Sequence, residues 1–333
     1  MLHATVSRNL LTFLMCLALF CLFGCDPSTG GSSSGGKDDA AGGSKGPRIV
    51  SLTPAITRML IDMGKRDQIV GVSKEDDASL GLPVCGSYNN PVIARIVELE
   101  PDLVLTESPM GQPGNVPALL RTLADQGVFE LKIIAHSQSI AGVERALMDA
   151  EVGLGKAVGD QKAAERAQRL MALRIELVQA AIKDAKRPRV LMLINPTTLG
   201  AIGTGVTHDE LLRLAGGTNA LAHLNIGYLT LDRAQLQETV RPDVVLIFEP
   251  NGVELSDGDP RLRAMEGLSI PAVMNRRFAV IQHSHAMLPS TALPEVLVEI
   301  ATVLHPDRAA AIREAYDTAE LVVKKSSSDK DGS

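Results

Sequence analysis

The chain has 333 residues, of which 45% are hydrophobic, and it carries a formal net charge of −6. The charges are spread along the sequence without a long basic run, which argues against a nucleic-acid-binding protein. Of the four cysteines, only Cys85 lies beyond residue 25, so no intrachain disulfide is possible in the body of the chain.

The first 24 residues have the features of a secretory signal. Arg8 precedes an apolar run over residues 10–23, which is shorter than the about 20 residues that a membrane span needs. The run ends at Gly24-Cys25, which resembles the bacterial lipobox, in which the cysteine receives diacylglycerol and becomes the new N-terminus. An ordinary signal with a chance cysteine is the alternative. We expect an exported protein whose membrane contact is a lipid on Cys25.

The two ends of the mature chain predict flexible segments. Residues 25–46 hold the lipidated cysteine and a run rich in Gly and Ser, which is typical of a flexible tether. Residues 309–333 are expected to finish a helix and then to fray, because residues 324–333 are mostly Ser, Lys and Asp.

The body between these ends contains an internal repeat, which predicts two lobes of similar topology over residues 47–153 and 188–308. A single short match would be weak, but several matches keep one offset. Each of these segments recurs 141 positions later: 47–50 at 188–191, 101–105 at 242–246, and Gly86 at Gly227.

Each lobe is expected to alternate strands and helices, which implies an α/β fold with Rossmann-like parallel sheets. A first helix should be capped by Thr53, have Pro54 in its first turn and end near Gly64. In the second lobe, Thr207 and Glu210 predict a capping box. The expected strands cover residues 48–52, 68–73, 102–106, 132–135, 189–194, 244–248 and 279–282.

A single long helix is predicted to join the lobes within residues 154–187. Its centre, residues 160–186, is rich in helix-forming residues, and its wide apolar face suggests that it packs on both lobes. Such a connection limits hinge motion. The apolar positions are Leu170, Leu173, Leu177 and Ala181 on one face, and Met171, Ile175, Val178 and Ile182 on a neighbouring face.

The motifs in their order resemble the iron-chelate and vitamin B12 periplasmic-binding family over roughly residues 47–307. The architecture that this resemblance implies is the helical-backbone solute-binding protein: two lobes joined by one long α-helix. The first lobe carries RIVSLTP at 48–54, IVGV at 69–72, LPVCGSY at 82–88 and IVELEPDLV at 96–104, and the second carries LLRLAGGTNA at 211–220 and RPDVV at 241–245.

The resemblance implies the substrate-binding protein of an ATP-driven importer, and we expect a monomer. It would capture a ferric siderophore, heme or corrinoid between its lobes and deliver it to a membrane permease. The family often has a glutamate in each lobe that engages arginines of the permease. The corresponding positions here, near Ala94 and near Ala234 or Gln235, are not acidic. Glu98 and Glu238 lie nearby but are displaced from the motif. Docking is therefore expected to use other contacts, unless the protein has no matching permease.

An enzyme is not expected. No Gly-x-Ser-x-Gly elbow is present, and residues 153–157 lack the hydroxyl residue and the earlier glycine of a phosphate-binding loop. Cys85 has no flanking signature of a nucleophile and is better interpreted as a small buried thiol. The alternative from another class is an orphan surface lipoprotein with a role in sensing or adhesion.

Ligands of two-lobed α/β proteins bind where loops leave the carboxyl ends of strands and the lobes face each other. The loops at these places carry the residues that we expect to contact the ligand. They are Thr53, Pro54, Ser87, Tyr88, Asn89, Thr204, His208, Tyr228, His283 and His285.

Two of the three tyrosines, Tyr88 and Tyr228, lie at repeat-related loop positions. A phenolate can ligate the iron of heme, and an aromatic ring can stack on a flat macrocycle. The resemblance favours Tyr88, because heme-binding relatives place a tyrosine in this loop. The alternative is a loop tyrosine with its ring packed and its hydroxyl in water. The absence of Trp and the aromatic content of 3% weaken the corrinoid option.

The histidines offer a weaker signal. In an extended backbone His283 and His285 would point the same way and face one ligand, but without acidic or cysteine partners they are more typical of a polar loop. His208 lies beside Gly203-Thr204-Gly205, whose free amides could hold an anion, although a solvated helix start is the alternative. We expect neither a metal site nor a resident cofactor.

Overall fold

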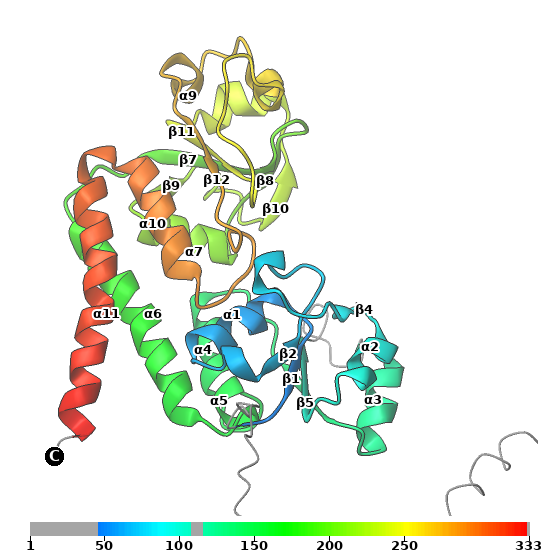
Figure 1. Ribbon diagram of the computed structural model, residues 1–333. Helices are drawn as coiled ribbons and strands as arrows, with labels where there is room; N and C mark the ends of the chain where they lie inside the picture. The colour runs from blue at the N-terminus through cyan, green and yellow to red at the C-terminus, as the bar shows by residue number, and fades with distance from the viewer. Residues whose placement is uncertain (1–45, 108–115, 332–333) are drawn as a thin grey trace, which may run out of the picture. The chain divides into compact units, whose positions relative to one another are not determined.

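The computed structural model describes residues 46–107 and 116–331, with side chains up to residue 325. The described residues belong to one compact unit. Figure 1 shows two lobes, each built on its own sheet, with two long helices running beside them. The predicted signal peptide, Cys25 and nearly all of the predicted tether lie outside the described residues. Among the described helices, none combines the length and the apolar character that crossing a membrane requires.

The first lobe contains a parallel four-stranded sheet, as predicted. Its strand order is β2-β1-β5-β6, and a separate antiparallel pair, β3–β4, lies outside it. Ile49 and Val50 of the central strand are fully buried, as expected for short apolar strands covered on both faces. The strands are β1 (Ile49–Ser51), β2 (Ile69–Gly71), β3 (Gly86–Ser87), β4 (Asn90–Pro91), β5 (Leu103–Glu107) and β6 (Glu130–Ile134).

The second lobe contains a six-stranded sheet of order β10-β8-β7-β11-β12, with β9 beside β7. Strands β7, β9, β11 and β12 are parallel, whereas β8 and β10 add an antiparallel edge that the sequence did not predict. Both edge strands are only three residues long, too short for a periodic pattern. The strands are β7 (Arg189–Asn195), β8 (Gly200–Ile202), β9 (Thr218–Asn219), β10 (Tyr228–Thr230), β11 (Val244–Phe248) and β12 (Phe278–Ile281).

Helices connect the strands of both lobes (Figure 1). The first lobe has α1 (Pro54–Asp62), η1 (Arg66–Gln68), η2 (Ala78–Leu80), α2 (Ile93–Glu98), α3 (Ala118–Asp125), α4 (Ile140–Met148) and α5 (Leu154–Ala157). The second has α7 (Thr207–Leu214), α8 (Arg233–Gln235), the π-helical turn η5 (Leu236–Val240), η6 (Pro260–Met265), α9 (Pro271–Met274), α10 (Leu293–Leu304) and η7 (Pro306–Arg308).

The lobes repeat one contact at the predicted offset. The backbone N–H of Arg48 donates to Asp102 Oδ2 at 2.7 Å, and the backbone N–H of Arg189 donates to Asp243 Oδ2 at 2.9 Å. In each lobe this bond joins the first strand to the strand that follows the repeated Pro-Asp. No strand among the described residues belongs to both main sheets.

The predicted bridging helix is confirmed as α6 (Gln161–Ala181), which begins after Asp160, whose carboxylate accepts a bond from Ala163 N at 3.0 Å. A second helix, α11 (Ala309–Asp331), packs along it, with Arg174 lying 4.2 Å from the centre of the Tyr316 ring. The expectation of a frayed tail from residue 324 was wrong, because the helix continues to Asp331. Ile312 and Ala319 of α11 are fully buried, and this packing stabilises the helix.

Two helix starts differ in detail from the sequence analysis. Thr53 precedes α1, as predicted, but its hydroxyl makes no capping bond. The prediction of a capping box formed by Thr207 and Glu210 was wrong, because α7 begins at Thr207 and its N-cap is Val206. Glu210 instead accepts a hydrogen bond at 3.1 Å from the backbone N–H of Ile140 in the first lobe. A partner across the lobes has therefore replaced a local one.

Candidate functional site

Two hollows lie between the lobes, at the carboxyl ends of strands from both sheets. The larger, of about 580 Å³, is named the acidic hollow, and the smaller, of about 200 Å³, is named the imidazole hollow. Leu288 lines both. The residues that line the acidic hollow include Asp62, Glu75, Asp76 and Asp77 of the first lobe and Ser284 and His285 of the second lobe. The residues that line the imidazole hollow include Glu107, His136 and Ser137 of the first lobe and Thr207, His208 and Tyr228 of the second lobe.

Four of the predicted ligand-binding residues line these hollows. Pro54 and His285 contribute to the acidic hollow, and His208 and Tyr228 to the imidazole hollow. The other six do not line either hollow, although Thr53 is buried immediately before Pro54 and Thr204 lies near the start of α7. These six are Thr53, Ser87, Tyr88, Asn89, Thr204 and His283.

Tyr88 lies in the tight turn between β3 and β4. Its half-buried ring packs against a small apolar cluster of the first lobe that includes Cys85 and Ile96. Within this turn, Ser87 Oγ donates to Asn89 Oδ1 at 2.7 Å. Gly86 has a φ of 85°, and a Cβ there would overlap the carbonyl oxygen of Asn90, so the turn requires glycine. Contact between Tyr88 and a ligand stays a prediction.

Asp76 is the most perturbed carboxyl group of the acidic hollow. Thr57 Oγ1 donates to Asp76 Oδ2 at 3.1 Å, and the backbone N–H of Ser73 donates to the same oxygen at 2.9 Å. Burial outweighs these bonds and raises the pKa of Asp76 to about 6. The hollow therefore holds an acid whose charge changes close to neutral pH.

The imidazole hollow contains a histidine–carboxylate pair that sequence reasoning missed. His136 Nδ1 lies 2.9 Å from Glu107 Oε2. The hydrogen bond to Glu107 raises the pKa of His136, against the opposing effect of burial. Glu107 ends β5 and His136 follows β6, which are neighbours in the sheet. The expected strands 102–106 and 132–135 were a signal for both residues, because side chains just beyond parallel strands meet at one edge.

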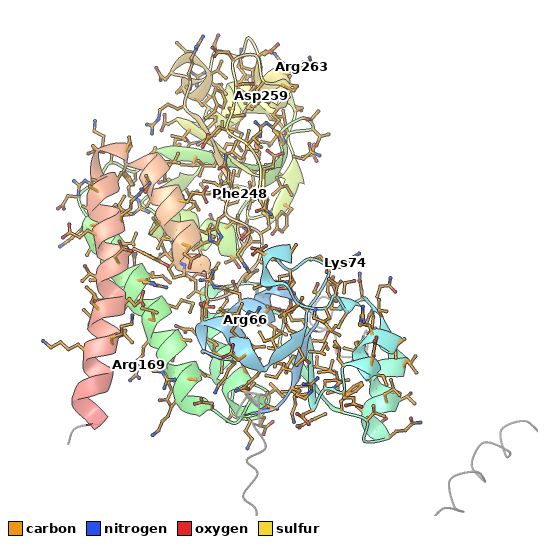
Figure 2. The ribbon with its side chains drawn as sticks, in the orientation of Figure 1. Arg66, Lys74, Arg169, Phe248, Asp259 and Arg263 are labelled. Atoms are coloured by element: carbon orange, nitrogen blue, oxygen red, sulfur yellow. The ribbon has the colours of Figure 1, made fainter. Side chains whose placement is uncertain are left out.

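His208 and Tyr228 face the same hollow from the second lobe. His208 Nε2 lies 2.9 Å from the carbonyl oxygen of Ala286, and burial lowers the pKa of the ring. The ring meets Phe248 edge-on with centroids 5.1 Å apart, and Figure 2 marks Phe248 at the end of the second lobe nearest the first. Tyr228 leaves 52% of its surface exposed on β10. The second lobe thus offers an exposed phenol and a buried imidazole to this hollow.

His283 and His285 make different contacts, because the chain turns after His283 instead of continuing as a strand. His283 Nε2 lies 2.8 Å from Glu295 Oε2, while His285 lines the acidic hollow, where burial lowers its pKa to about 4. Glu295 also pairs with Arg58 of the first lobe and accepts from Tyr316 Oη at 3.1 Å. Across residues 46–107 and 116–331, no group of three or more His, Cys, Asp or Glu is placed to hold a metal ion.

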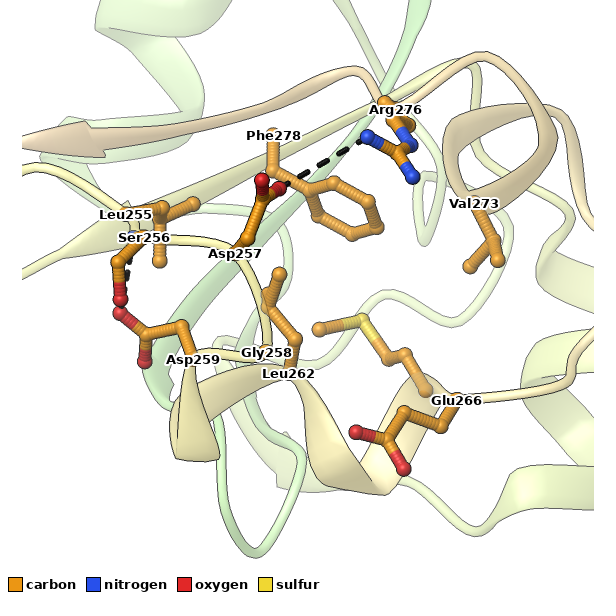
Figure 3. A pocket seen from close by; sticks show the side chains of 11 residues that line it. Leu255, Ser256, Asp257, Gly258, Asp259, Leu262, Glu266, Val273, Arg276 and Phe278 are labelled. Atoms are coloured by element: carbon orange, nitrogen blue, oxygen red, sulfur yellow. Dashed lines mark hydrogen bonds and ion pairs between the residues drawn. The ribbon is translucent and has the colours of Figure 1, made fainter.

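A third hollow, of about 360 Å³, lies within the second lobe alone (Figure 3). Leu262 and Phe278 contribute its apolar wall, and Asp257 pairs with Arg276 at 3.8 Å across its rim. Figure 2 marks Asp259 at the end of this lobe that lies away from the first lobe. Because one lobe alone forms it, this hollow is distinct from the candidate site between the lobes.

Comparisons with known proteins agree with this architecture. A cobalamin-binding protein of Halobacterium salinarum is 26% identical over 274 residues, covering 78% of this chain and 69% of that protein. YvrC of Bacillus subtilis, described as an uncharacterized ABC transporter substrate-binding lipoprotein, is 24% identical over 268 residues, covering 78% of this chain and 80% of that protein. The solved structure of a periplasmic heme-binding protein from Pseudomonas aeruginosa has the same fold, with a TM-score of 0.62 at 22% identity, covering 78% of this chain and 93% of that one.

A family model described as periplasmic binding protein matches residues 49–284, which include both sheets and the helix between them. The match spans most of the chain and both lobes that line the candidate site. The protein therefore belongs to the periplasmic binding protein family, whose members bind solutes.

Proposed function

We propose that the protein is the substrate-binding lipoprotein of an ATP-binding-cassette importer. It captures an iron chelate, either a ferric siderophore or heme, or a corrinoid between its lobes and delivers it to a permease. The observation that carries this proposal is the pair of adjoining hollows lined from both lobes at the carboxyl ends of their strands. Together they have the size and the few convergent polar groups of a small-molecule site.

The lobes are held together firmly enough for the cleft to exist before ligand arrives. Besides α6 and α11, direct contacts cross between the lobes: Arg58 with Glu295, and Ile140 N–H with Glu210. A cleft formed in advance needs little reorganisation when ligand binds, so more of the contact energy appears as affinity.

The chemical class of ligand rests on the relatives and on the cleft. One relative is named as binding cobalamin and another as binding heme, and both ligands are metal macrocycles. The cleft offers imidazole, phenol and carboxylate groups between apolar walls such as Val206 and Met287. Such walls suit a flat ring, and the polar groups suit its metal or its rim.

Titration of the purified protein with hemin, aquocobalamin and ferrioxamine B tests the proposal. At least one should bind in a one-to-one complex with a dissociation constant in the micromolar range or below, detected by absorption and calorimetry. Substituting Leu288→Arg, at the junction of the two hollows, should abolish that binding, whereas Leu262→Arg in the separate hollow should not. Absence of binding by all three ligands would refute the proposed ligand class.

Coupling to a permease is tested separately. Ala94 and Gln235 are exposed in the structure, and neither supplies the acidic side chain that the family resemblance implies for docking. Gln235 instead forms a capping box with Asp232, with bonds of 2.7 and 2.9 Å. This observation favours a second candidate: an orphan surface lipoprotein that uses the cleft for sensing or adhesion. Ligand uptake that stops when the protein is deleted from its cell supports import, and unchanged uptake supports the second candidate.

A further inference from the structure

The hollow within the second lobe, named the outer hollow, has no part in the proposed function (Figure 3). Its volume of about 360 Å³ falls in the range of small-molecule sites. Val253 and Met274, which are close in sequence to its lining residues, leave their apolar side chains exposed. Open apolar surface of this kind is typical of a ligand site. The apolar residues that line the outer hollow are Leu255, Leu262, Met265, Val273 and Phe278.

Two arginine side chains fix η6, which forms one wall of the outer hollow. At the start of η6, Arg261 donates to the two carboxylate oxygens of Asp259 at 2.9 and 2.7 Å, and to two carbonyl oxygens of the preceding loop. At its end, Arg233 donates to the carbonyl oxygens of Ala264 and Glu266 at 2.7 and 2.8 Å. The wall is therefore in place before a ligand arrives, and binding needs little reorganisation.

The charged groups at the rim favour one sign of ligand charge. The carboxylate of Asp259 is occupied by Arg261, whereas Asp257 pairs only loosely with Arg276, because both of these side chains are almost fully exposed. The carboxylate of Glu266 makes no ion pair or hydrogen bond within the part of the chain that the structure describes. Two available carboxylates thus face a single guanidinium among the lining residues, and this excess of negative charge attracts a cation.

We infer that the outer hollow is a second ligand site, which takes a small molecule with an aromatic or branched apolar body and a cationic amine. The body lies against Leu262 and Phe278, and the amine lies at the rim with Asp257 and Glu266. In Figure 3 the side chain of Leu262 is drawn between these two carboxylates. The site is independent of the proposed function, because it shares no lining residue with either hollow of the cleft.

Tryptamine is the probe for the test, with full-length mature protein. Because the chain contains no tryptophan, the anisotropy of indole fluorescence reports the bound amine with little background from the protein. Wild-type protein should bind tryptamine in a saturable one-to-one complex with a submillimolar dissociation constant. Indole-3-propionate has the same ring and an anionic end, and it should bind about threefold more weakly or worse.

Substitutions inside the hollow locate the bound molecule. Leu262→Arg fills the apolar interior and should abolish tryptamine binding, with urea denaturation as the check that the variant folds. Leu288→Arg, at the junction of the two cleft hollows, should leave tryptamine binding unchanged.

Substitutions of exposed charges at the rim test the amine without disturbing the fold. Glu266→Lys should weaken tryptamine binding by about threefold or more. The matched control is Glu254→Lys, because Glu254 is an exposed residue of the neighbouring loop that does not line the hollow. Arg276→Ala should strengthen binding, since it removes the competing cation and frees Asp257.

Two results would overturn the site itself: no saturable binding of tryptamine to wild-type protein, or equal binding by wild type and folded Leu262→Arg. Two others would overturn the cationic class: equal affinities for tryptamine and indole-3-propionate, or equal affinities of Glu266→Lys and Glu254→Lys for tryptamine. Because these readouts involve no metal chelate, they leave the proposed function to its own test in the cleft.

Discussion

Arg58 Nη1, on α1 of the first lobe, lies 3.2 Å from Glu295 Oε2, on α10 of the second. The same carboxylate group meets His283 and Tyr316, so a single acid joins α1, α10, α11 and the loop after β12. Burial opposes its ionisation, but the hydrogen bonds from His283 and Arg58 outweigh burial and lower the pKa of Glu295 to about 2. This carboxylate is therefore one of the contacts that hold the two lobes together.

Removing this carboxylate should destabilise the protein. Glu295→Ala leaves His283 partly buried without this partner and leaves Arg58 with Asp62 alone, and we expect the free energy of unfolding to fall by about 2–3 kcal/mol. Urea denaturation measures the loss. Because the folded-state pKa of Glu295 lies below its ordinary value, the stabilisation should be present above about pH 4.5 and disappear as the pH falls toward 2.

Glu98→Ala is the matched control for this prediction. Glu98 pairs with Arg95 at 2.9 Å, but both side chains are about half exposed or more. Exposed pairs of this kind contribute about 0.5 kcal/mol or less. Equal losses in the two variants would show that the contact between the lobes has no special role in stability.

Asp76 should make the protein less stable as the pH rises from about 4 to about 6. Its folded-state pKa is raised to about 6, so the folded protein holds a proton that the unfolded chain has already released. Above pH 6 Asp76 is charged in both states, and the cost of burying that charge lowers the free energy of unfolding in full. Asp76→Asn keeps an oxygen for Thr57 and Ser73 and should raise the free energy of unfolding at pH 7 by about 1–3 kcal/mol.

Denaturation curves of both proteins between pH 4 and pH 7 check this prediction. His285, with a pKa lowered to about 4 by burial, adds an opposite slope over the same range, but it does so in wild type and variant alike. Asp77→Asn, in the same loop, removes a carboxyl group whose pKa is lowered by bonds from Ser79 and should not reproduce the effect. Parallel curves for wild type and Asp76→Asn would contradict the prediction.

We expect Tyr88 to contact a bound macrocycle through its ring. Because that ring packs against the cluster around Cys85, Tyr88→Phe is expected to leave hemin affinity nearly unchanged, while Tyr88→Ala weakens it. Calorimetric titration with hemin measures both. A loss of more than tenfold in Tyr88→Phe, about 1.4 kcal/mol, with loss of a phenolate-to-iron charge-transfer band, would instead make Tyr88 a ligand to the iron.

Cys25 is expected to carry the lipid anchor. Metabolic labelling with a radioactive fatty acid should mark wild-type protein, and Cys25→Ala should abolish the label and release the protein from the membrane fraction. Cys85→Ala serves as the comparison, because that thiol is buried in the first lobe and offers no site for lipid. Equal labelling of wild type and Cys25→Ala would refute the lipoprotein interpretation.

Local sequence determined the central parallel strands of the two sheets and the helix between them, but not the short strands β8, β9 and β10. Strands such as β5 and β11 are short apolar runs preceded by the same Pro-Asp, and each aspartate accepts the same backbone bond in its lobe. The pattern of α6 repeats over many turns, so its apolar face was predictable without knowledge of its neighbours. These features depend on residues close in the chain or on one repeated offset, which a sequence displays directly.

Only the tertiary structure decided which side chains form the cleft. Glu107 and His136 meet because β5 and β6 are neighbours in the sheet, and Arg58 and Glu295 meet although 237 positions separate them. Glu210, predicted to cap its own helix, bonds to the other lobe instead. A polar side chain near the end of an element has several possible partners of similar energy, and burial between the lobes selects among them. The fold was therefore predictable from local patterns, whereas the site depends on how two separately predictable lobes come together.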